Sequence, residues 1–297
     1  MANFLDVDDC TTDELATVLD RAAAIKADYR EHGGTDLFDG QTLGMIFEKP
    51  STRTRVSFET GMTQLGGHAI FLGPDDIGLH GREPVKDIAR AVGRYVDVLM
   101  ARVYDHDDVV ELGEYAPVPV INALTDDAHP CQTLADLLTI REHFDDDVSV
   151  AWVGDGNNVC QSFVVGAAMT GIDLTVATPE GYGVDEDVLS RAADFGGEPE
   201  TGHDPEAAVA DADVVYTDVW VSMGQEDERE EKLRAFDGFQ ITQELLGDRS
   251  LMHCLPAHRG EEVTDAVIES DNAIVWDQAE NRLHAQKGLL AWLAEQE

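Results

Sequence analysis

The first half of the chain alternates short apolar runs with longer amphipathic stretches. The apolar runs are typical of buried strands and lie at residues 43–47, 69–72, 98–103 and 118–121. The amphipathic stretches predict helices near residues 13–29, 52–65, 85–95 and 133–144. Such alternation indicates a mostly parallel sheet that is covered by helices on both faces.

A second series of apolar runs follows the acidic triplet Asp145-Asp146-Asp147, at residues 148–153, 174–177, 214–217, 251–254 and 273–276. We therefore expect an α/β protein of two domains, each a mostly parallel sheet flanked by helices. The predicted domains are residues 1–145 and 146–297, with the last helix free to pack back on the first domain. Because ligands bind beyond the carboxyl ends of strands in open α/β sheets, the active site is expected in the interdomain cleft.

Charge is the least ordinary property of the composition. The 297 residues include 60 acidic and only 20 basic side chains, for a formal net charge of -40. This balance argues against nucleic acid and anionic membranes as partners, because both require surfaces rich in Lys and Arg. A dispersed acidic coat is typical of a halophilic protein, since high salt screens self-repulsion.

The four cysteines are scattered without the spacing of a disulfide framework, at Cys10, Cys131, Cys160 and Cys254. No apolar segment approaches the ~20 residues of a membrane span. The first residues also lack a basic and apolar signal region. These features predict a soluble cytoplasmic protein with reduced thiols.

The most informative segment directly follows the first predicted strand, and it contains Ser51, Thr52, Arg53, Thr54 and Arg55. A strand before it and a helix after it would place these residues at a helix N-terminus, where free N–H groups and the helix dipole attract anions. Hydroxyl groups add neutral donors, and guanidinium groups donate charge-assisted bonds to phosphate oxygens. An ordinary capped helix with surface arginines is the alternative, but the doubled Thr-Arg pattern favours an anion site.

Other polar residues follow later strands of the first series. Arg102 ends the third predicted strand, and His129-Pro130-Cys131-Gln132 lies in the loop after the fourth. A neutral His129 beside an arginine would stabilise a carbonyl oxygen as it gains negative charge. Taken alone, a histidine in this position is more often a residue at the start of a helix, with its ring hydrogen-bonded to the backbone, than a catalytic group.

Two alternative chemistries receive weaker support. The turn Gly154-Asp155-Gly156 resembles the opening of a dinucleotide-binding turn, but the third glycine of that fingerprint is missing, so a nicotinamide dehydrogenase is disfavoured. A histidine and a cysteine lie close together in the sequence at positions 129/131 and at positions 253/254, but neither pair has the spacing of a zinc site. The doublet at 253–254 would also project to opposite faces of a strand, so no metal is predicted.

Five motifs occur in order along nearly the whole chain: Ser51-Thr52-Arg53-Thr54-Arg55, Arg102, His129-Pro130-Cys131-Gln132, Ser222-Met223-Gly224 and His253-Cys254-Leu255-Pro256. Together they resemble the transcarbamylase family. Asp218 with the Ser-Met-Gly loop and the His-Cys-Leu-Pro motif resemble its ornithine carbamoyltransferases. The resemblance implies transfer of a carbamoyl group from carbamoyl phosphate to the δ-amine of L-ornithine, giving L-citrulline and phosphate without a cofactor.

The resemblance also implies a role for each matching residue. The carbamoyl phosphate-binding domain would be 1–145 and the ornithine-binding domain 146–297. Carbamoyl phosphate would contact Ser51, Thr52, Arg53, Thr54, Arg102, His129, Gln132, Cys254, Leu255 and Arg282. Ornithine would contact Asn158, Asp218, Ser222 and Met223. The implied catalytic residues are Arg102, His129 and Cys254.

The family further implies a homotrimer or a multiple of trimers. Residues 75–84 resemble the loop that members lend to the neighbouring subunit's site, although Gly78 stands where many have glutamine. His80 and Arg82 are the candidates to replace that contact. A transcarbamylase for another amine, such as putrescine or an acylated ornithine, is the alternative function, and it would differ in the loop at 218–224.

Overall fold

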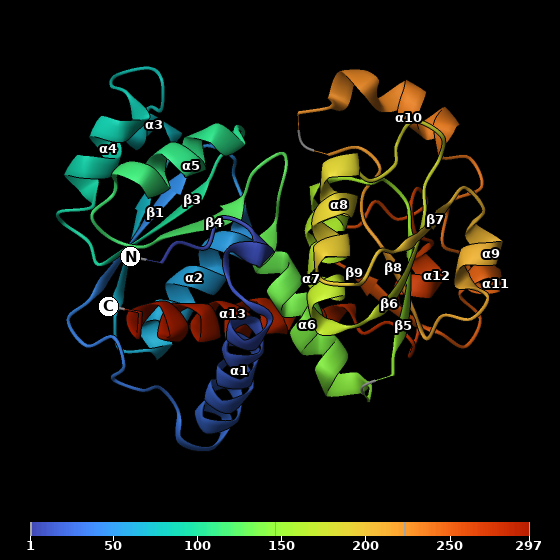
Figure 1. Ribbon diagram of the computed structural model, residues 1–297, viewed down its shortest axis with the longest axis horizontal. Coiled ribbons are helices and arrows are strands. Elements are labelled where there is room, and N and C mark those ends of the chain that lie inside the picture. The colour runs from blue at the N-terminus through green and yellow to red at the C-terminus, as the bar shows by residue number, and fades with distance from the viewer. Residues whose placement is uncertain (1, 146, 223, 297) are drawn as a thin grey trace. The chain divides into compact units, whose positions relative to one another are not determined.

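The computed structural model describes residues 2–145, 147–222 and 224–296 (Figure 1). The chain divides into two compact units, Met1–Leu138 with Asn281–Glu297, and Thr139–Glu280. The unit boundaries fall inside two helices, α6 (Pro130–His143) and α13 (Val275–Ala294). The residues from Asn281 onward therefore group with the first unit.

The first unit contains a four-stranded sheet in the order β2-β1-β3-β4, and all its strand pairs are parallel. Every residue of β3 is buried, which fits a strand covered on both faces. Helices α1, α2 and α5 begin after the capping residues Thr11, Ser51 and Asp105. The elements are η1 (Val7–Asp9), α1 (Thr12–His32), β1 (Thr42–Phe47), α2 (Thr52–Gln64), β2 (His68–Leu72), α3 (Pro74–Ile77), α4 (Val85–Val92), β3 (Val98–Arg102), α5 (His106–Tyr115) and β4 (Val120–Leu124).

The second unit contains a five-stranded parallel sheet in the order β7-β6-β5-β8-β9. Its core includes a stack of Trp220 on Phe236, with ring centroids 5.3 Å apart, and Tyr182 packs against the same phenyl ring. The elements are β5 (Ser149–Val153), α7 (Asn158–Thr170), β6 (Asp173–Ala177), α8 (Glu186–Asp194), β7 (Glu200–Gly202), α9 (Pro205–Val209), β8 (Val214–Thr217), η2 (Glu226–Glu228), α10 (Arg229–Ala235), α11 (Gln243–Leu246), β9 (Ser250–His253) and α12 (Asp265–Ile268).

Two parallel sheets flanked by helices confirm the predicted fold class, while two local predictions were wrong and one strand was not predicted. The run 273–276 is not a strand: Ala273 makes one isolated bridge to Leu251, and helix α13 begins at Val275. The short strand β7 is polar and exposed, so no apolar run revealed it. Helix α6 begins at Pro130 rather than at Thr133 after the motif, and proline suits the first helical position because it needs no N–H partner there.

No helix among residues 2–145, 147–222 and 224–296 is both long and apolar enough to cross a membrane.

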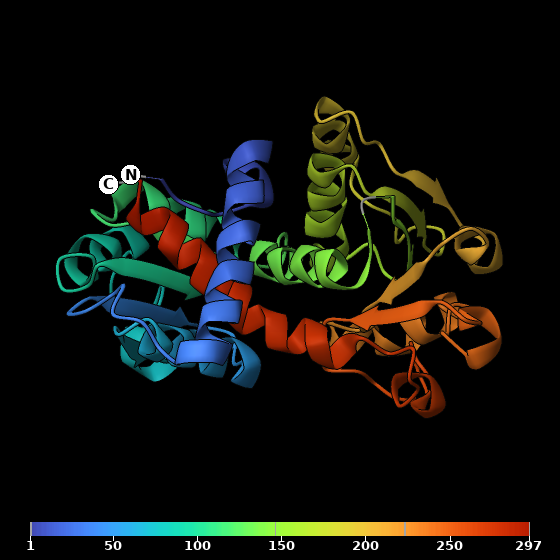
Figure 2. The same ribbon diagram turned by 90° about the horizontal axis from the view of Figure 1, so that it is seen from below.

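Helices α1 and α13 cross closely in the first unit (Figure 2). A Cβ atom on Gly288 would lie 2.6 Å from the carbonyl oxygen of Val18, so only glycine allows this approach. Nearby, Lys287 is fully buried, and its Nζ donates to Oε1 of Gln64 at 2.8 Å and lies over the ring of Tyr29. Burial lowers the pKa of Lys287 to about 8.

This shift predicts a specific dependence of stability on pH. Between pH 8 and 10.5 the folded protein has lost the Lys287 proton while the unfolded chain still holds it, so the free energy of unfolding should rise with pH. Wild type should gain about 3 kcal/mol relative to Lys287→Met over this range. Denaturant unfolding at constant salt measures the difference, with the half-buried Lys86→Met as control. A difference that is independent of pH would contradict the assignment.

Candidate active site

The polar segment after β1 lies at a topological switch point of the first sheet. Strands β1 and β3 are neighbours, and the chain leaves them toward opposite edges, since β2 flanks β1 and β4 flanks β3. Phe47 pairs with Arg102 at the carboxyl ends of the two strands. The carbonyl oxygen of Arg102 also accepts bonds from the N–H groups of Glu48 and Lys49. Ser51 and Arg102 are thereby brought to the position where open α/β sheets bind ligands.

Ser51 is the N-cap of α2, as the sequence predicted for the start of this helix. Its Oγ accepts the N–H of Thr54 at 3.2 Å and lies 3.0 Å from the hydroxyl of Thr54. Arg53 is exposed and makes no ion pair with any residue that the structure describes. Arg55 instead pairs with Glu59 at 2.9 Å and covers the ring of Phe71. Arg53 is therefore the guanidinium of this segment that is available to an anion.

A second cationic cluster in the same unit joins α6 to α13. The Arg282 guanidinium donates to Oε1 of Gln132, and its Nη1 lies 3.4 Å from Nε2 of His129. Gln132 in turn donates to the buried Asp136 at 2.7 Å. Because arginine only donates, Nε2 of His129 is the acceptor and the ring proton belongs on Nδ1.

The charge state of His129 follows from this environment. Burial of the imidazole, together with the nearby charges of Arg282 and Arg102, holds the pKa of His129 well below its usual range. His129 is therefore a neutral ring beside two arginines at neutral pH. A neutral donor surrounded by fixed positive charge is suited to stabilising an oxygen that becomes negative.

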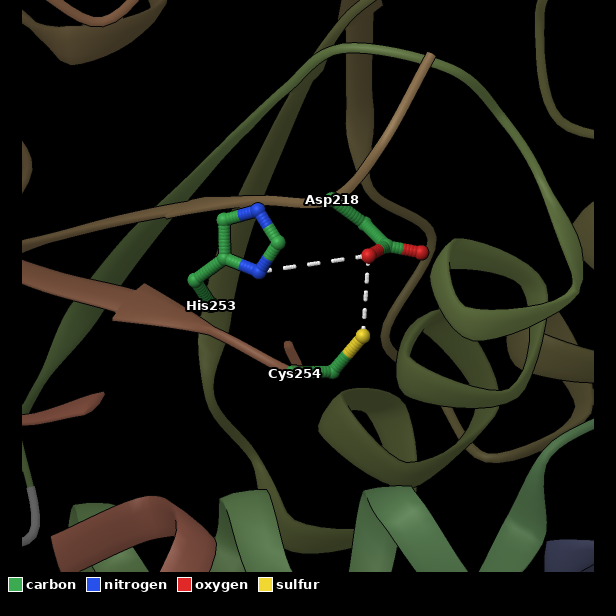
Figure 3. Close-up of side chains that lie close together, drawn as sticks. All are labelled: Asp218, His253 and Cys254. Carbon is green, nitrogen blue, oxygen red and sulfur yellow. Dashed lines mark hydrogen bonds and ion pairs between the residues drawn. The ribbon is translucent and has the colours of Figure 1, made fainter. Parts of the chain in front are cut away.

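The second unit carries a separate polar site at its own switch point, between β5 and β8. Asp218 follows β8, and one of its carboxylate oxygens faces both His253 and Cys254 (Figure 3). Oδ1 accepts from the Cys254 thiol at 2.9 Å, and Oδ2 accepts from the side-chain amide of Asn157 at 2.9 Å. Asn157 caps α7, so one residue both starts the helix and orients the carboxylate.

His253 lies beside this pair and has a defined tautomer. Its Nδ1 accepts the N–H of Leu255 at 2.9 Å, so the ring proton belongs on Nε2, which lies 3.2 Å from Oε1 of the buried Glu262. Nδ1 is also 4.0 Å from Oδ1 of Asp218. The prediction that His253 and Cys254 project to opposite faces was wrong, because β9 ends at His253 and both side chains approach Asp218 (Figure 3).

Asp218, His253 and Cys254 are close enough together to hold a metal ion. The imidazole nitrogen that faces Asp218 already accepts the backbone N–H of Leu255. Ligation by all three residues would require that hydrogen bond to break. The geometry therefore fits a hydrogen-bonded thiol and carboxylate better than a preformed metal centre.

A buried lysine connects the two loops around Asp218. Lys232 donates to Asp155 at 2.6 Å and to the side chain of Gln225 at 2.8 Å. Gln225 also accepts the N–H of Ser222, which ties the 222–225 loop to the turn after β5. Burial raises the pKa of Asp155, and the hydrogen bond and charge of Lys232 oppose that rise. Lys232 thus holds in place the loop that contains a predicted ornithine-binding residue.

The glycines of the turn after β5 have a structural explanation. Gly154 has φ 149°, and a Cβ atom on Gly156 would lie 2.5 Å from the backbone of Gly183. Both positions therefore exclude a side chain on steric grounds. Asn158 is the first residue of α7 and lies at the same switch point as Asp218.

The predicted substrate-binding residues divide between the two units. Ser51, Thr52, Arg53, Thr54, Arg102, His129, Gln132 and Arg282 belong to the first, and Asn158, Asp218, Ser222, Cys254 and Leu255 belong to the second. Leu255 has φ 59°, an uncommon value for a residue with a side chain. The predicted role of Met223 lies outside the described residues.

Sequence reasoning missed two residues that shape the second site, Lys232 and Glu262. The scarcity of lysine was a signal for Lys232, because the chain keeps only five. His253 was considered as a metal ligand and as part of the His-Cys-Leu-Pro motif, but its contact with Glu262 was not predicted. No local pattern marks Glu262, which meets His253 only in the folded chain.

Comparison with known proteins supplies the class to which this two-unit architecture belongs. Residues 2–142 match the family model described as aspartate/ornithine carbamoyltransferase, carbamoyl-P binding domain. Residues 146–293 match the corresponding Asp/Orn binding domain. The chain therefore belongs to the aspartate/ornithine carbamoyltransferase family.

Individual relatives agree with this assignment. The ornithine carbamoyltransferase of Haloquadratum walsbyi is 66% identical, over 98% of this chain and 97% of its own. The solved ornithine carbamoyltransferase of Pyrococcus furiosus is 53% identical with a TM-score of 0.93, covering 97% of this chain and 96% of that one. The anabolic enzyme of Campylobacter jejuni is 39% identical with a TM-score of 0.94, covering 100% of both chains.

The Lys232–Asp155 pair yields a stability prediction. Replacing Lys232 by Met leaves the Asp155 carboxylate buried without its cation, and we expect a loss of about 3–5 kcal/mol in the free energy of unfolding. The double variant Lys232→Met with Asp155→Asn should recover much of this loss, because it removes the unpaired charge. Denaturant unfolding measures both, with Lys86→Met as the matched control. A double variant no more stable than Lys232→Met would refute the charge-pair explanation.

Proposed function

We propose that this protein is an ornithine carbamoyltransferase, which transfers the carbamoyl group of carbamoyl phosphate to the δ-amine of L-ornithine. The observation that carries the proposal is the Cys254–Asp218–Asn157 arrangement within a unit that matches an Asp/Orn binding domain. The 66% identity to the Haloquadratum walsbyi ornithine carbamoyltransferase supports the same substrate. The products are L-citrulline and phosphate.

The first unit is proposed to bind carbamoyl phosphate. Phosphate would accept bonds from the N-terminus of α2, with its hydroxyls at positions 51, 52 and 54, and from Arg53. Arg102 would bridge the phosphate and the carbonyl oxygen. His129, Gln132 and Arg282 would hold the carbamoyl end, which is consistent with the hydrogen bond between Gln132 and Arg282.

Catalysis would rest on orientation and fixed positive charge. The ornithine amine attacks the carbamoyl carbon, a C–N bond forms, the carbonyl oxygen becomes an oxyanion, and the C–O bond to phosphate then breaks as the amine loses a proton. His129 is suited to donate to that oxygen because its low pKa keeps it neutral beside Arg102 and Arg282. Arg102 would compensate the charge that moves onto the departing phosphate.

The second unit is proposed to bind ornithine and to place its amine. Asp218 would attract a cationic amine of the substrate, while Asn158, Ser222 and Met223 would bind its α-carboxylate and α-amine. Cys254 would lie near the attacking nitrogen, while the Leu255 carbonyl would help to fix the carbamoyl end. Because the free δ-amine resembles that of lysine, with a pKa of about 10.4, it must lose a proton before attack. The rate should therefore rise from neutral to alkaline pH.

We further propose an assembly of trimers, a cytoplasmic location and a halophilic origin. The net charge of -40 and the similarity to a Haloquadratum walsbyi protein support the last of these. Within the chain, His80 is bonded to Asp108 at 2.8 Å. Arg82 is exposed and is therefore the better candidate to serve a neighbouring subunit's site.

A direct assay tests the function. Purified protein in molar KCl should form citrulline from carbamoyl phosphate and ornithine, measured colorimetrically, with little carbamoyl product from aspartate, putrescine or acetylornithine. Phosphate release should match product formation one to one. Preference for putrescine or acetylornithine would identify the alternative transcarbamylase, and absence of all carbamoyl transfer would remove the enzymatic proposal.

Variants on the two units should affect the two substrates differently. Arg102→Ala should reduce kcat by at least ~100-fold, because it removes a charge that acts in the transition state. Cys254→Ala should mainly raise the KM for ornithine and leave carbamoyl phosphate binding close to wild type. Arg90→Ala, an exposed arginine on α4, is the control and should keep full activity. The opposite pattern in steady-state kinetics would reverse the two assignments.

A further inference from the structure

Three side chains meet in the segment between β9 and α12 of the second unit. His258, Glu261 and Glu262 each offer one ligand atom, and these atoms lie within 4.8 Å of one another. His258 and Glu261 have no role in the proposed reaction. Glu262 contacts the candidate active site only through the bond of one of its oxygens to His253.

Each carboxylate of this cluster is oriented through one of its two oxygens. Oε1 of Glu261 accepts the guanidinium of Arg229. Oε1 of Glu262 accepts the backbone N–H of His258 and lies 3.2 Å from Nε2 of His253. Outer partners of this kind are what orient the ligands of metal sites.

Each of the three side chains also has one buried polar atom that lacks a hydrogen bond. Nδ1 of His258, Oε2 of Glu261 and Oε2 of Glu262 have no hydrogen-bond partner among the residues that the structure describes. Glu262 is 0% exposed, so water does not solvate its second oxygen from outside. Buried carboxylate oxygens in native proteins normally have a partner, so an unpaired one has room for an ion or an ordered water.

The spacing of these atoms distinguishes a simple ion pair from two ligands of one metal ion. Nδ1 of His258 lies 3.7 Å from Oε2 of Glu261, which is too long for a hydrogen bond in a simple ion pair. Two ligands at 2.0–2.2 Å from one metal ion are about 3 to 4 Å apart. The observed separation therefore fits two ligands of a shared ion.

We propose that His258, Glu261 and Glu262 form a binding site for a divalent transition-metal cation such as Mn²⁺ or Zn²⁺. One imidazole and two carboxylates suit these ions, whereas Mg²⁺ and Ca²⁺ prefer oxygen ligands alone. The ion would neutralise two glutamates in the segment that follows Cys254. It would also fix the carboxylate whose other oxygen meets His253.

The backbone around the cluster is already well held. Gln240 donates its side-chain amide to the carbonyl oxygen of Glu261 at 2.7 Å, and the N–H of Ile241 donates to the carbonyl oxygen of Glu262 at 2.8 Å. The ligands are therefore placed by the fold and need little rearrangement to bind an ion. The site is structural in this proposal and takes no part in bond making.

Mn²⁺ is the appropriate probe, because the thiol of Cys254 would attract Zn²⁺ to a different group. Free Mn²⁺ is measured by electron paramagnetic resonance while the full chain is titrated in molar KCl with excess Mg²⁺, which occupies exposed carboxylates. We expect one Mn²⁺ per chain in wild type. Glu261→Gln and His258→Ala should each weaken binding at least ten-fold, whereas the exposed Glu244→Gln on α11 should match wild type.

Two results would overturn the site: no Mn²⁺ bound to wild type under these conditions, or unchanged binding in both His258→Ala and Glu261→Gln. Circular dichroism first establishes that each variant is folded, and His258→Gln replaces any variant that is not. Mn²⁺ should also raise the Tm of wild type and leave that of Glu261→Gln unchanged. Ion counting needs no substrate, so its outcome is independent of the carbamoyl-transfer assay.

Discussion

The placement of scarce positive charge is the constraint on which this structure depends. With 20 basic against 60 acidic side chains, each cation has several carboxylates competing for it. The chain nevertheless keeps four of its five lysines in buried positions, where each has a polar partner from a distant segment. These pairs are Lys26 with Asn281, Lys49 with Asp126, Lys232 with Asp155 and Lys287 with Gln64.

The candidate active site also contains buried cationic side chains. Arg102 and Arg282 are buried around His129, where low exposure strengthens their field and keeps the imidazole neutral. The second unit holds the complementary negative charge in Asp218, with hydrogen bonds to both of its oxygens. The first unit thus gathers positive charge and the second places a negative one, within a chain whose formal net charge is -40.

Much of the fold could be predicted because most of its strands are buried on both faces and therefore appear as continuous apolar runs. Two segments do not follow this rule. β7 is polar and exposed, and the run at 273–276 is apolar because Ile274 and Val275 are buried where α13 begins. At the site, Ser51 and Arg102 could be found from their positions after strands. The tautomer of His253 and its contact with Glu262 could not, because they depend on partners brought together only by folding.

The burial of nearly all the lysines has a practical consequence for handling the protein. Lys86 is the one lysine with appreciable solvent exposure, so lysine-directed dyes and cross-linkers should attach mainly there. Conjugation through amines would thus give an almost uniform product. The same chemistry would give a heterogeneous mixture on a protein with a lysine-rich surface.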